Sequence, residues 1–250
     1  MQASNKELMT VVASRMLQDG TVVFVGVGLP NMAANLARQT RAPRLVLVYE
    51  TGIVGAKPFR MPLSVGDAGV AANSQCILGS FETFNWVLQG GRIDVGFLGG
   101  AQIDRWGNLN STVIGDYHRP TVRLPGSGGA GDIASMARRT IVVMTHERRR
   151  FPENVDFITS PGYVGGRRGR AEAGIRGGGP EMVITDLGIL GFDEDGEMEL
   201  RSVHPGVTVA QVQDCTGWKL KVCDAVRETQ PPSEAELQAL RSIDKEGFYR

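Results

Sequence analysis

The residue of this chain best placed to do chemistry is a single carboxylate. Glu50 directly follows the apolar run Leu45–Tyr49, so it lies at the end of a predicted buried strand. A carboxylate there can act as a catalytic residue. A lone glutamate after a strand is also often a solvated strand end or a helix cap. Position alone therefore makes Glu50 a candidate catalytic residue, with these alternatives open.

Glycine is unusually frequent, at 33 of 250 residues, and it gathers in loops between apolar runs. Gly26 and Gly28 follow the run Val22–Val25 and precede a helical segment, a pattern typical of dinucleotide-binding turns. Asn31 at the third glycine position and Pro30, which lacks an N–H for a pyrophosphate, argue against that ligand. The alternatives are a tight strand-to-helix turn and a turn that approaches an acyl ligand.

Two further loops could bring backbone close to a ligand. Gly126-Ser127-Gly128-Gly129-Ala130 offers successive N–H groups that can form an anion-binding concavity, although a flexible loop has the same spacing. It lacks the Gly-Lys-Ser/Thr ending of a phosphate-binding loop, so nucleotide hydrolysis is not expected. Gly99-Gly100-Ala101-Gln102 follows the run Ile93–Leu98, and open parallel sheets bind ligands beyond the carboxyl ends of their strands.

An alternation of strands and helices must position these loops. Helix starts are indicated by the capping boxes Ser4–Glu7 and Ser233–Glu236 and by Pro30, and a further helix is predicted over Phe81–Gln89. Such an alternation implies crossover connections and an α/β fold, with an open, mostly parallel sheet and helices on both faces in three layers. The predicted strands are Val22–Val25, Leu45–Tyr49, Ile93–Leu98 and Ile141–Thr145.

The remaining segments are less regular. Residues 51–80 are predicted to be rich in loops, and the Arg/Gly stretch Gly165–Gly179 is interpreted as a surface loop. A small C-terminal meander is expected over Met182–Thr185, Leu187–Phe192 and Met198–Val203. No low-complexity linker divides the chain, so a single domain over residues 1–250 is predicted.

Composition excludes several classes of protein. Lys+Arg and Asp+Glu are 27 each, so neither nucleic acid nor an anionic membrane is expected as the main partner. No apolar run approaches the length of a membrane span. Cys76, Cys215 and Cys223 form no close pair and no metal spacing, which favours reduced thiols in the cytoplasm. No metal site is predicted, and His118, His146 and His204 are interpreted as structural hydrogen-bonding residues.

Taken in order, the motifs resemble those of the class I coenzyme A transferases, and within them the glutaconate CoA-transferase beta subunits. Any one tetrapeptide is weak evidence, whereas their order and spacing through nearly the whole chain are specific. The matching motifs are Tyr49-Glu50-Thr51-Gly52, Ser64-Val65-Gly66-Asp67, Gly99-Gly100-Ala101-Gln102-Ile103-Asp104, Gly107-Asn108-Leu109-Asn110-Ser111-Thr112, Ile114-Gly115-Asp116-Tyr117-His118, Gly126-Ser127-Gly128-Gly129-Ala130, His146-Glu147-Arg148-Arg149-Arg150-Phe151 and Thr159-Ser160-Pro161-Gly162.

The resemblance implies a CoA-transferase-like fold in which Glu50 is the nucleophile and Gly128 and Gly129 donate backbone N–H groups to the thioester oxygen. It implies no cofactor beyond CoA as a substrate, with an acyl-CoA and a carboxylic acid, such as the dicarboxylate glutaconate, as the reactants. It also implies an obligatory alpha subunit in a heterotetramer or larger hetero-oligomer. Tyr49 departs from the small or acidic residue expected before the glutamate. Candidate contacts to CoA or the acyl group are Gly26, Gly28, Gly126, Ser127, Ala130 and Gln102.

Two other functions fit parts of this pattern. Relatives on the same scaffold open rings of CoA thioesters, which adds water across a carbon–carbon bond and needs no glutamyl-CoA intermediate. A catalytically silent module that senses acyl-CoA or a sugar phosphate would keep the glycine loops alone. Retention of Glu50 at the strand end favours CoA transfer.

Overall fold

The computed structural model describes residues 3–58, 60–64 and 66–247, so Val65 of the Ser64–Asp67 motif lies outside the described residues. The chain divides into two compact units. Unit 1 comprises residues 1–97 and 231–250, and unit 2 comprises residues 98–230. A single domain over residues 1–250 stays a prediction, because two compact units can belong to one domain.

The strands of unit 1 run in the order β5-β1-β2-β3-β4. β1 pairs in parallel with β2 on one side and with β5 on the other, and β3 and β4 add to β2 as antiparallel strands. The chain order therefore reverses at β1, which is the position where open α/β sheets bind ligands. The strands are β1 (Val22–Phe24), β2 (Val46–Val48), β3 (Ile53–Val54), β4 (Cys76–Ile77) and β5 (Val95–Leu98).

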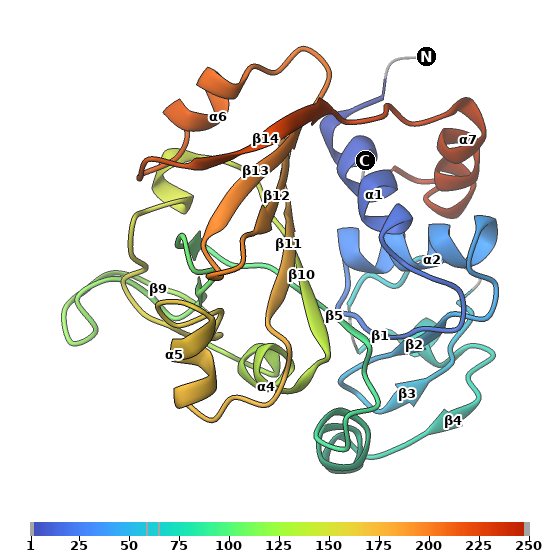
Figure 1. The fold of residues 1–250 in the computed structure, drawn as a ribbon. Helices are drawn as coiled ribbons and strands as arrows, with labels where there is room; N and C mark the ends of the chain where they lie inside the picture. The colour runs from blue at the N-terminus through green and yellow to red at the C-terminus, as the bar shows by residue number, and fades with distance from the viewer. Residues whose placement is uncertain (1–2, 59, 65, 248–250) are drawn as a thin grey trace. The chain divides into compact units, whose positions relative to one another are not determined.

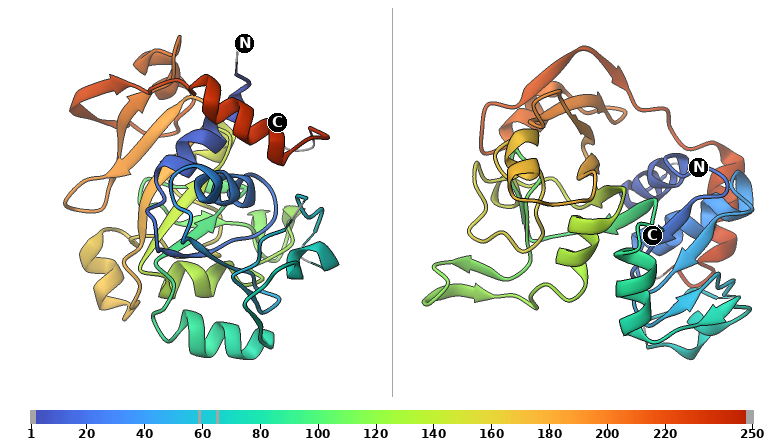
Figure 2. Two further views of the ribbon diagram at one scale, coloured as in Figure 1. Left: turned by 90° about the vertical axis from the view of Figure 1, so that its right-hand side faces the viewer. Right: turned by 60° about the horizontal axis from the view of Figure 1, so that its bottom comes forward.

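Helices cover both faces of these strands. Figures 1 and 2 show α1, α2 and α7 packed together on one face, with α2 in contact with both of the others. On the other face η2 contacts β1, since the rings of Phe84 and Phe24 lie 5.6 Å apart. The helical segments are α1 (Asn5–Arg15), α2 (Leu29–Thr40), the 3₁₀ turn η1 (Ala68–Ala71), α3 (Ser80–Glu82), the π-helical η2 (Thr83–Leu88) and α7 (Glu234–Ile243).

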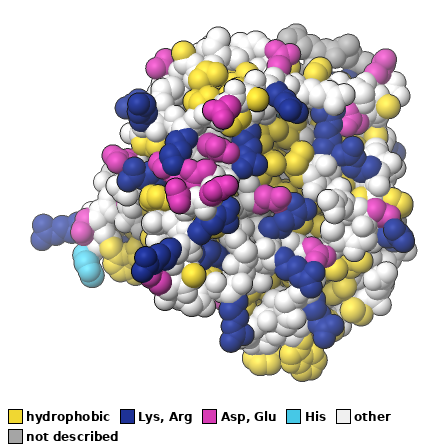
Figure 3. Space-filling view, in the orientation of Figure 1, with side chains coloured by type: hydrophobic (Ala, Val, Ile, Leu, Met, Phe, Trp, Pro, Cys, Tyr) yellow, Lys and Arg dark blue, Asp and Glu magenta, His cyan; other side chains and the backbone are white. Residues whose placement is uncertain are grey.

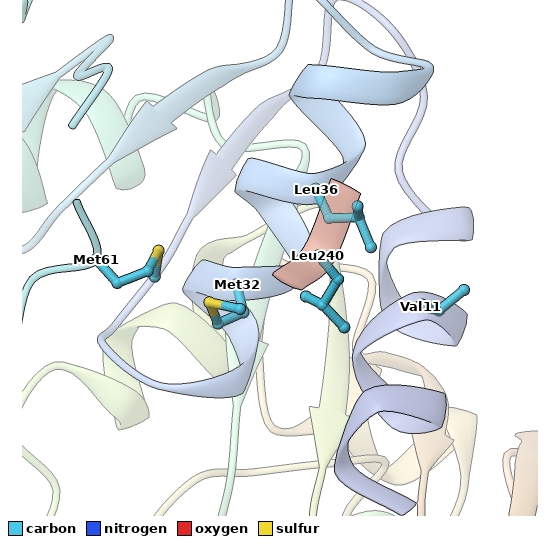
Figure 4. Close-up of a cluster of buried hydrophobic side chains, with 5 residues drawn as sticks. All are labelled: Val11, Met32, Leu36, Met61 and Leu240. Atoms are coloured by element: carbon cyan, nitrogen blue, oxygen red, sulfur yellow. The ribbon is translucent and has the colours of Figure 1, made fainter. Parts of the chain in front are cut away.

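Residues far apart in the sequence form the core between these helices. Figure 4 shows one buried cluster formed by Val11 of α1, Met32 and Leu36 of α2, Leu240 of α7 and, outside the helices, Met61. Each of the three helices supplies at least one apolar side chain to this cluster, and burying such a side chain contributes roughly 1.5–3 kcal/mol. The C-terminal helix is thereby held against the N-terminal part of the chain.

Unit 2 contains the strand series β10-β11-β12-β13-β14 and two small hairpins, β6-β7 and β8-β9. β10 and β11 pair in parallel, β11, β12 and β13 form an antiparallel meander, and β14 pairs in parallel with β13. The strands are β6 (Gln102–Ile103), β7 (Leu109–Asn110), β8 (Val113–Gly115), β9 (Pro120–Arg123), β10 (Arg139–Val143), β11 (Pro180–Ile184), β12 (Gly188–Phe192), β13 (Met198–Val203) and β14 (Lys221–Glu228). The helices are α4 (Ala130–Met136), the 3₁₀ turn η3 (Arg148–Arg150), α5 (Arg167–Glu172) and α6 (Val209–Asp214).

The predicted open α/β architecture with a C-terminal meander is confirmed, as are both capping boxes. The prediction of a surface loop over Gly165–Gly179 is wrong only in part: most of these residues are exposed, but the stretch contains the helix α5. Arg170 of that helix is only 4% exposed, and its guanidinium donates to four backbone carbonyls. These bonds replace the water that an exposed arginine would keep.

The loop-rich prediction for residues 51–80 needs a smaller correction. The two-residue strands β3 and β4 lie within it and extend the sheet beyond β2. Two residues are too few to show a hydrophobic alternation, so periodicity could not reveal them.

Candidate active site

Glu50 lies in the tight turn that joins β2 to β3. The backbone N–H of Gly52 donates to the carbonyl of Tyr49 over 2.9 Å, and the N–H of Tyr49 donates to the carbonyl of Ile53 over 3.0 Å. The side chain of Glu50 is half-buried. Within the described chain its carboxylate forms no hydrogen bond and no ion pair, so its oxygens are free to react.

Gly52 is the residue that this turn cannot replace. Its φ of +94° lies in the left-handed region, and a Cβ there would overlap the carbonyl oxygen of Leu78. The Leu78 N–H in turn donates to the Gly52 carbonyl over 2.8 Å. The Glu-x-Gly pattern therefore has a local physical reason, since only glycine allows this conformation and this approach.

The residue before the nucleophile candidate is fully buried. Tyr49 has no exposed side-chain surface, and its hydroxyl donates to Asn31 Oδ1 over 2.8 Å. Burial raises the pKa of Tyr49 to about 12, so this phenol stays neutral at ordinary pH. In the sequence, Asn31 departed from the glycine of a dinucleotide-binding turn and Tyr49 from the small or acidic residue expected before the glutamate. Nothing in a single sequence indicates that these two residues are in contact.

The Gly26–Gly28 loop lies beside the Glu50 turn. Phe24 of β1 pairs with Val48 of β2 in parallel, and Gly26 and Glu50 each follow two residues later. Gly28 has φ +101° and caps α2, and an added Cβ at Gly26 or Gly28 would meet open space. Packing within the chain does not require glycine at these two positions, so the loop leaves room for a ligand.

The Gly126–Ala130 loop of unit 2 leads directly into α4. Gly126 and Gly128 have φ values of +98° and +49°, and an added Cβ at either would meet nothing within 4 Å. Ser127 closes the loop, since its carbonyl accepts from Ala130 N–H and its hydroxyl from Gly131 N–H. Among the described residues, the N–H groups of Gly128 and Gly129 have no acceptor. They are available as donors to a ligand oxygen.

Gln102 is held in a network within unit 2. Its Nε2 donates to Asp156 Oδ2 over 3.0 Å, and its Oε1 accepts from Asn110 Nδ2 over 2.7 Å. The side chain is only 6% exposed. A contact from Gln102 to CoA stays a prediction, and its amide would have to leave these bonds to make one.

The turn after Gln102 is also held internally. Asp104 Oδ1 accepts from the N–H groups of Trp106 and Asn108, and Asp104 Oδ2 accepts from Asn108 Nδ2. Desolvation raises the pKa of Asp104, while these three donors act in the opposite direction. Asp104 therefore shapes the loop between β6 and β7.

The two buried histidines have structural partners, as predicted, whereas His118 is exposed and its ring forms no hydrogen bond among the described residues. His146 is 3% exposed and bonds to the hydroxyls of Thr185 and Thr216. Burial lowers the pKa of His146 to about 4, so it stays neutral at physiological pH. His204 Nε2 pairs with the Thr185 carbonyl at 2.8 Å.

No group of three or more His, Cys, Asp or Glu side chains in the described chain is placed to hold a metal ion. Nor does any helix among these residues combine the length and apolar character needed to cross a bilayer. Figure 3 shows acidic and basic side chains lying close together on one face, in keeping with 27 residues of each sign in the chain.

A carboxylate without a partner lies in a turn at the carboxyl edge of an open α/β sheet, beside a glycine loop with open space, and this arrangement is compatible with covalent acyl transfer. The coenzyme A transferase family model matches residues 6–214. The chain belongs to the coenzyme A transferase family, and the predicted family and enzyme class are confirmed.

Two relatives are similar over almost their whole length. The chain is 49% identical to the B-type subunit of the 3-oxoadipate CoA-transferase of Pseudomonas knackmussii, covering 96% of this chain and 93% of that protein. It is 40% identical to the B-type subunit of the glutaconate CoA-transferase of Acidaminococcus fermentans, covering 95% and 91%. The crystal structure of the A. fermentans glutaconate enzyme matches with a TM-score of 0.93 at 37% identity, over 100% of this chain and 98% of the matched chain.

A more distant relative carries a different name. The cholesterol ring-cleaving hydrolase IpdB subunit of Mycobacterium tuberculosis is 27% identical, over 96% of this chain and 94% of that protein. The two relatives described above, with 49% and 40% identity, are both named as CoA transferases. They support CoA transfer more strongly than ring cleavage.

Proposed function

We propose that this chain is the B-type subunit of a heteromeric CoA transferase in which Glu50 is the nucleophile. The observation that carries the proposal is the free Glu50 carboxylate in a turn whose backbone is bonded on both sides. The names of the two closer relatives support a dicarboxylate substrate, of the 3-oxoadipate or glutaconate kind, and a partner A-type subunit. We expect an assembly of two of each subunit or larger.

The chemistry needs only a carboxylate and oxyanion donors. Glu50 attacks the acyl-CoA carbonyl, the carbon–sulfur bond breaks, and CoA leaves as a thiolate, so that the acyl group and Glu50 form a mixed anhydride. The thiolate attacks the Glu50 carbonyl, which releases the donor acid and leaves a glutamyl-CoA thioester. The acceptor carboxylate then reverses these steps, so the reaction is ping-pong.

Each attack creates a negatively charged oxygen that must be stabilised. We assign this role to the N–H groups of Gly128 and Gly129, because neither has an acceptor in the described chain. One such donor contributes roughly 3–4 kcal/mol in well-studied enzymes. The open space at Gly26, Gly28 and Gly126 supports their assignment as contacts to CoA or the acyl group. Ser127 and Ala130, in the same loop as Gly128, remain further candidates.

We expect CoA to act as a substrate and no further cofactor to be required. The free cysteines Cys76, Cys215 and Cys223 support a reducing compartment, and we propose the cytoplasm.

The test is capture of the intermediate on the complex of this chain with its partner subunit. Incubation with acyl-CoA alone should leave CoA on Glu50, and borohydride should then reduce the thioester and inactivate the enzyme. Glu50→Ala should lower transfer by more than about four decades, equivalent to roughly 5 kcal/mol. Glu172→Gln, at an exposed carboxylate that is ion-paired with Arg168, is the matched control and should be fully active.

Two results would contradict the proposal. If Glu50→Ala transferred CoA at the full rate, Glu50 would not be the nucleophile. If CoA were found on another residue, that residue would be the nucleophile instead. Hydration of a cyclic CoA thioester by Glu50→Ala would favour the ring-hydrolase alternative, for which the 27% identical relative is the supporting observation.

A further inference from the structure

The two irregular residues beside the candidate nucleophile are partners in the structure. Asn31 occupies the third glycine position of a dinucleotide-like loop, and Tyr49 stands where a small or acidic residue was expected. Their side chains meet in the bond from the Tyr49 hydroxyl to Asn31 Oδ1, and neither has exposed surface. The bond joins the first turn of α2 to the end of β2.

The bond continues as a chain along α2. Asn31 Oδ1 also accepts from Asn35 Nδ2 over 2.8 Å, and Asn35 Oδ1 accepts from Arg38 Nη2 over 2.8 Å. Arg38 Nη1 donates to the carbonyl of Ala56 over 2.6 Å. Spacings of four and three residues place these side chains on one helix face.

Both ends of this chain of hydrogen bonds are occupied. Asn31 Oδ1 accepts from two donors, whereas Asn31 Nδ2 is buried without a partner among the described residues. Desolvation lowers the pKa of Arg38, but its guanidinium remains a cation, and bonds from a charged donor are stronger than neutral ones. Tyr49 is therefore held by a partly charged network that α2 supports.

The bond between Tyr49 and Asn31 acts on Glu50 through the backbone. Among the three residues at the start of the turn, only Tyr49 has a side-chain hydrogen bond: the Glu50 carboxylate is free, and the Thr51 hydroxyl is buried without a partner in the described chain. The Tyr49 backbone makes both bonds that close the turn, to Gly52 and Ile53. Movement of the Tyr49 side chain would therefore move the backbone that carries Glu50.

We propose that Tyr49 and Asn31 are positioning residues that hold Glu50 at the placement from which it attacks the thioester. The inference rests on the proposed role of Glu50 as nucleophile. Neither positioning residue touches the reacting atoms. Since a misplacement of about 1 Å can slow a reaction roughly 100-fold, their loss should appear in the rate of attack and not in CoA binding.

The experiment compares Tyr49→Phe, Asn31→Leu and the double variant, each in complex with the partner subunit. Asn31→Leu leaves the buried Tyr49 hydroxyl without its acceptor, whereas Tyr49→Phe leaves Asn31 Oδ1 with its bond from Asn35 Nδ2. The double change removes both polar groups, and Asn35 Nδ2 keeps its bond to the Asn31 carbonyl. We expect Asn31→Leu to unfold at lower denaturant concentration, Tyr49→Phe to lose less stability, and the double variant to recover most of the loss seen in Asn31→Leu. The rate of glutamyl-CoA formation should fall about 10- to 100-fold in all three, with KM for acyl-CoA changed less than about twofold.

Tyr163→Phe is the matched control. Tyr163 is 4% exposed, and its hydroxyl donates to the Pro180 carbonyl over 3.0 Å within unit 2. Its removal should cost similar stability and leave the rate of glutamyl-CoA formation unchanged.

If Tyr49 and Asn31 only stabilised the fold, the double variant would recover the rate of glutamyl-CoA formation together with its stability. That result, or wild-type rates in the single variants, would overturn the inference. Failure of the proposed function is seen separately, because the wild-type complex would then carry no CoA on Glu50 in the same assay.

Discussion

Replacement of Gly52 by alanine tests whether the turn at Glu50 depends on this one glycine. At φ +94° an alanine is in the left-handed region, which costs about 1–2 kcal/mol. Its Cβ would also overlap the Leu78 carbonyl oxygen, so the turn and the segment after β4 must separate.

Moving the turn at Gly52 away from Leu78 breaks backbone hydrogen bonds whose typical free energy is known. The bond from Leu78 N–H to the Gly52 carbonyl and the bond from Gly52 N–H to the Tyr49 carbonyl are 2.8 and 2.9 Å long. At about 0.5–1.5 kcal/mol each, their loss together with the backbone strain gives roughly 2–5 kcal/mol. That is a large fraction of the free energy of unfolding of a typical domain, which is about 5–15 kcal/mol.

Gly20→Ala supplies the matched control. Gly20 has φ +83°, and an added Cβ there would meet nothing within 4 Å, so only the strain of about 1–2 kcal/mol applies. Urea unfolding followed by tryptophan fluorescence gives both free energies, and CoA transfer by the reconstituted complex gives the effect on Glu50. Equal losses of stability in the two variants, or full transfer by Gly52→Ala, would refute the reasoning.

Three further outcomes are expected. Gly129→Val should lower kcat more than it raises KM, because the oxyanion donor acts mainly in the transition state; a change in KM alone would contradict this role. Burial lowers the pKa of His146 to about 4, so the neutral side chain contributes about 3 kcal/mol to the free energy of unfolding above pH 6.5, and this is lost as the pH falls toward 4. Urea unfolding between pH 6.5 and 4 should show this fall in stability, and His146→Phe should abolish the pH dependence. Arg170→Met should destabilise the chain by about 3 kcal/mol or more, since it leaves four carbonyls without a donor, whereas Arg168→Met on the exposed face of α5 should change thermal unfolding little.

Much of the fold and the location of the candidate nucleophile could be predicted from local pattern. Short apolar runs marked β1, β2 and β5, and the capping boxes marked the starts of α1 and α7. These signals are local, because a capping side chain and the N–H that it accepts are three residues apart. The position of Glu50 at the end of β2 followed from the same kind of signal.

What the sequence by itself determined is therefore the set of elements and the residues at their ends. Only the tertiary structure decided which of these residues meet. Asn31 and Tyr49 are 18 residues apart, and they pair because the parallel register of β1 and β2 brings the end of β2 to the first turn of α2. The burial of Arg170 likewise depends on carbonyls from three separate segments, and no periodicity within one segment encodes such contacts.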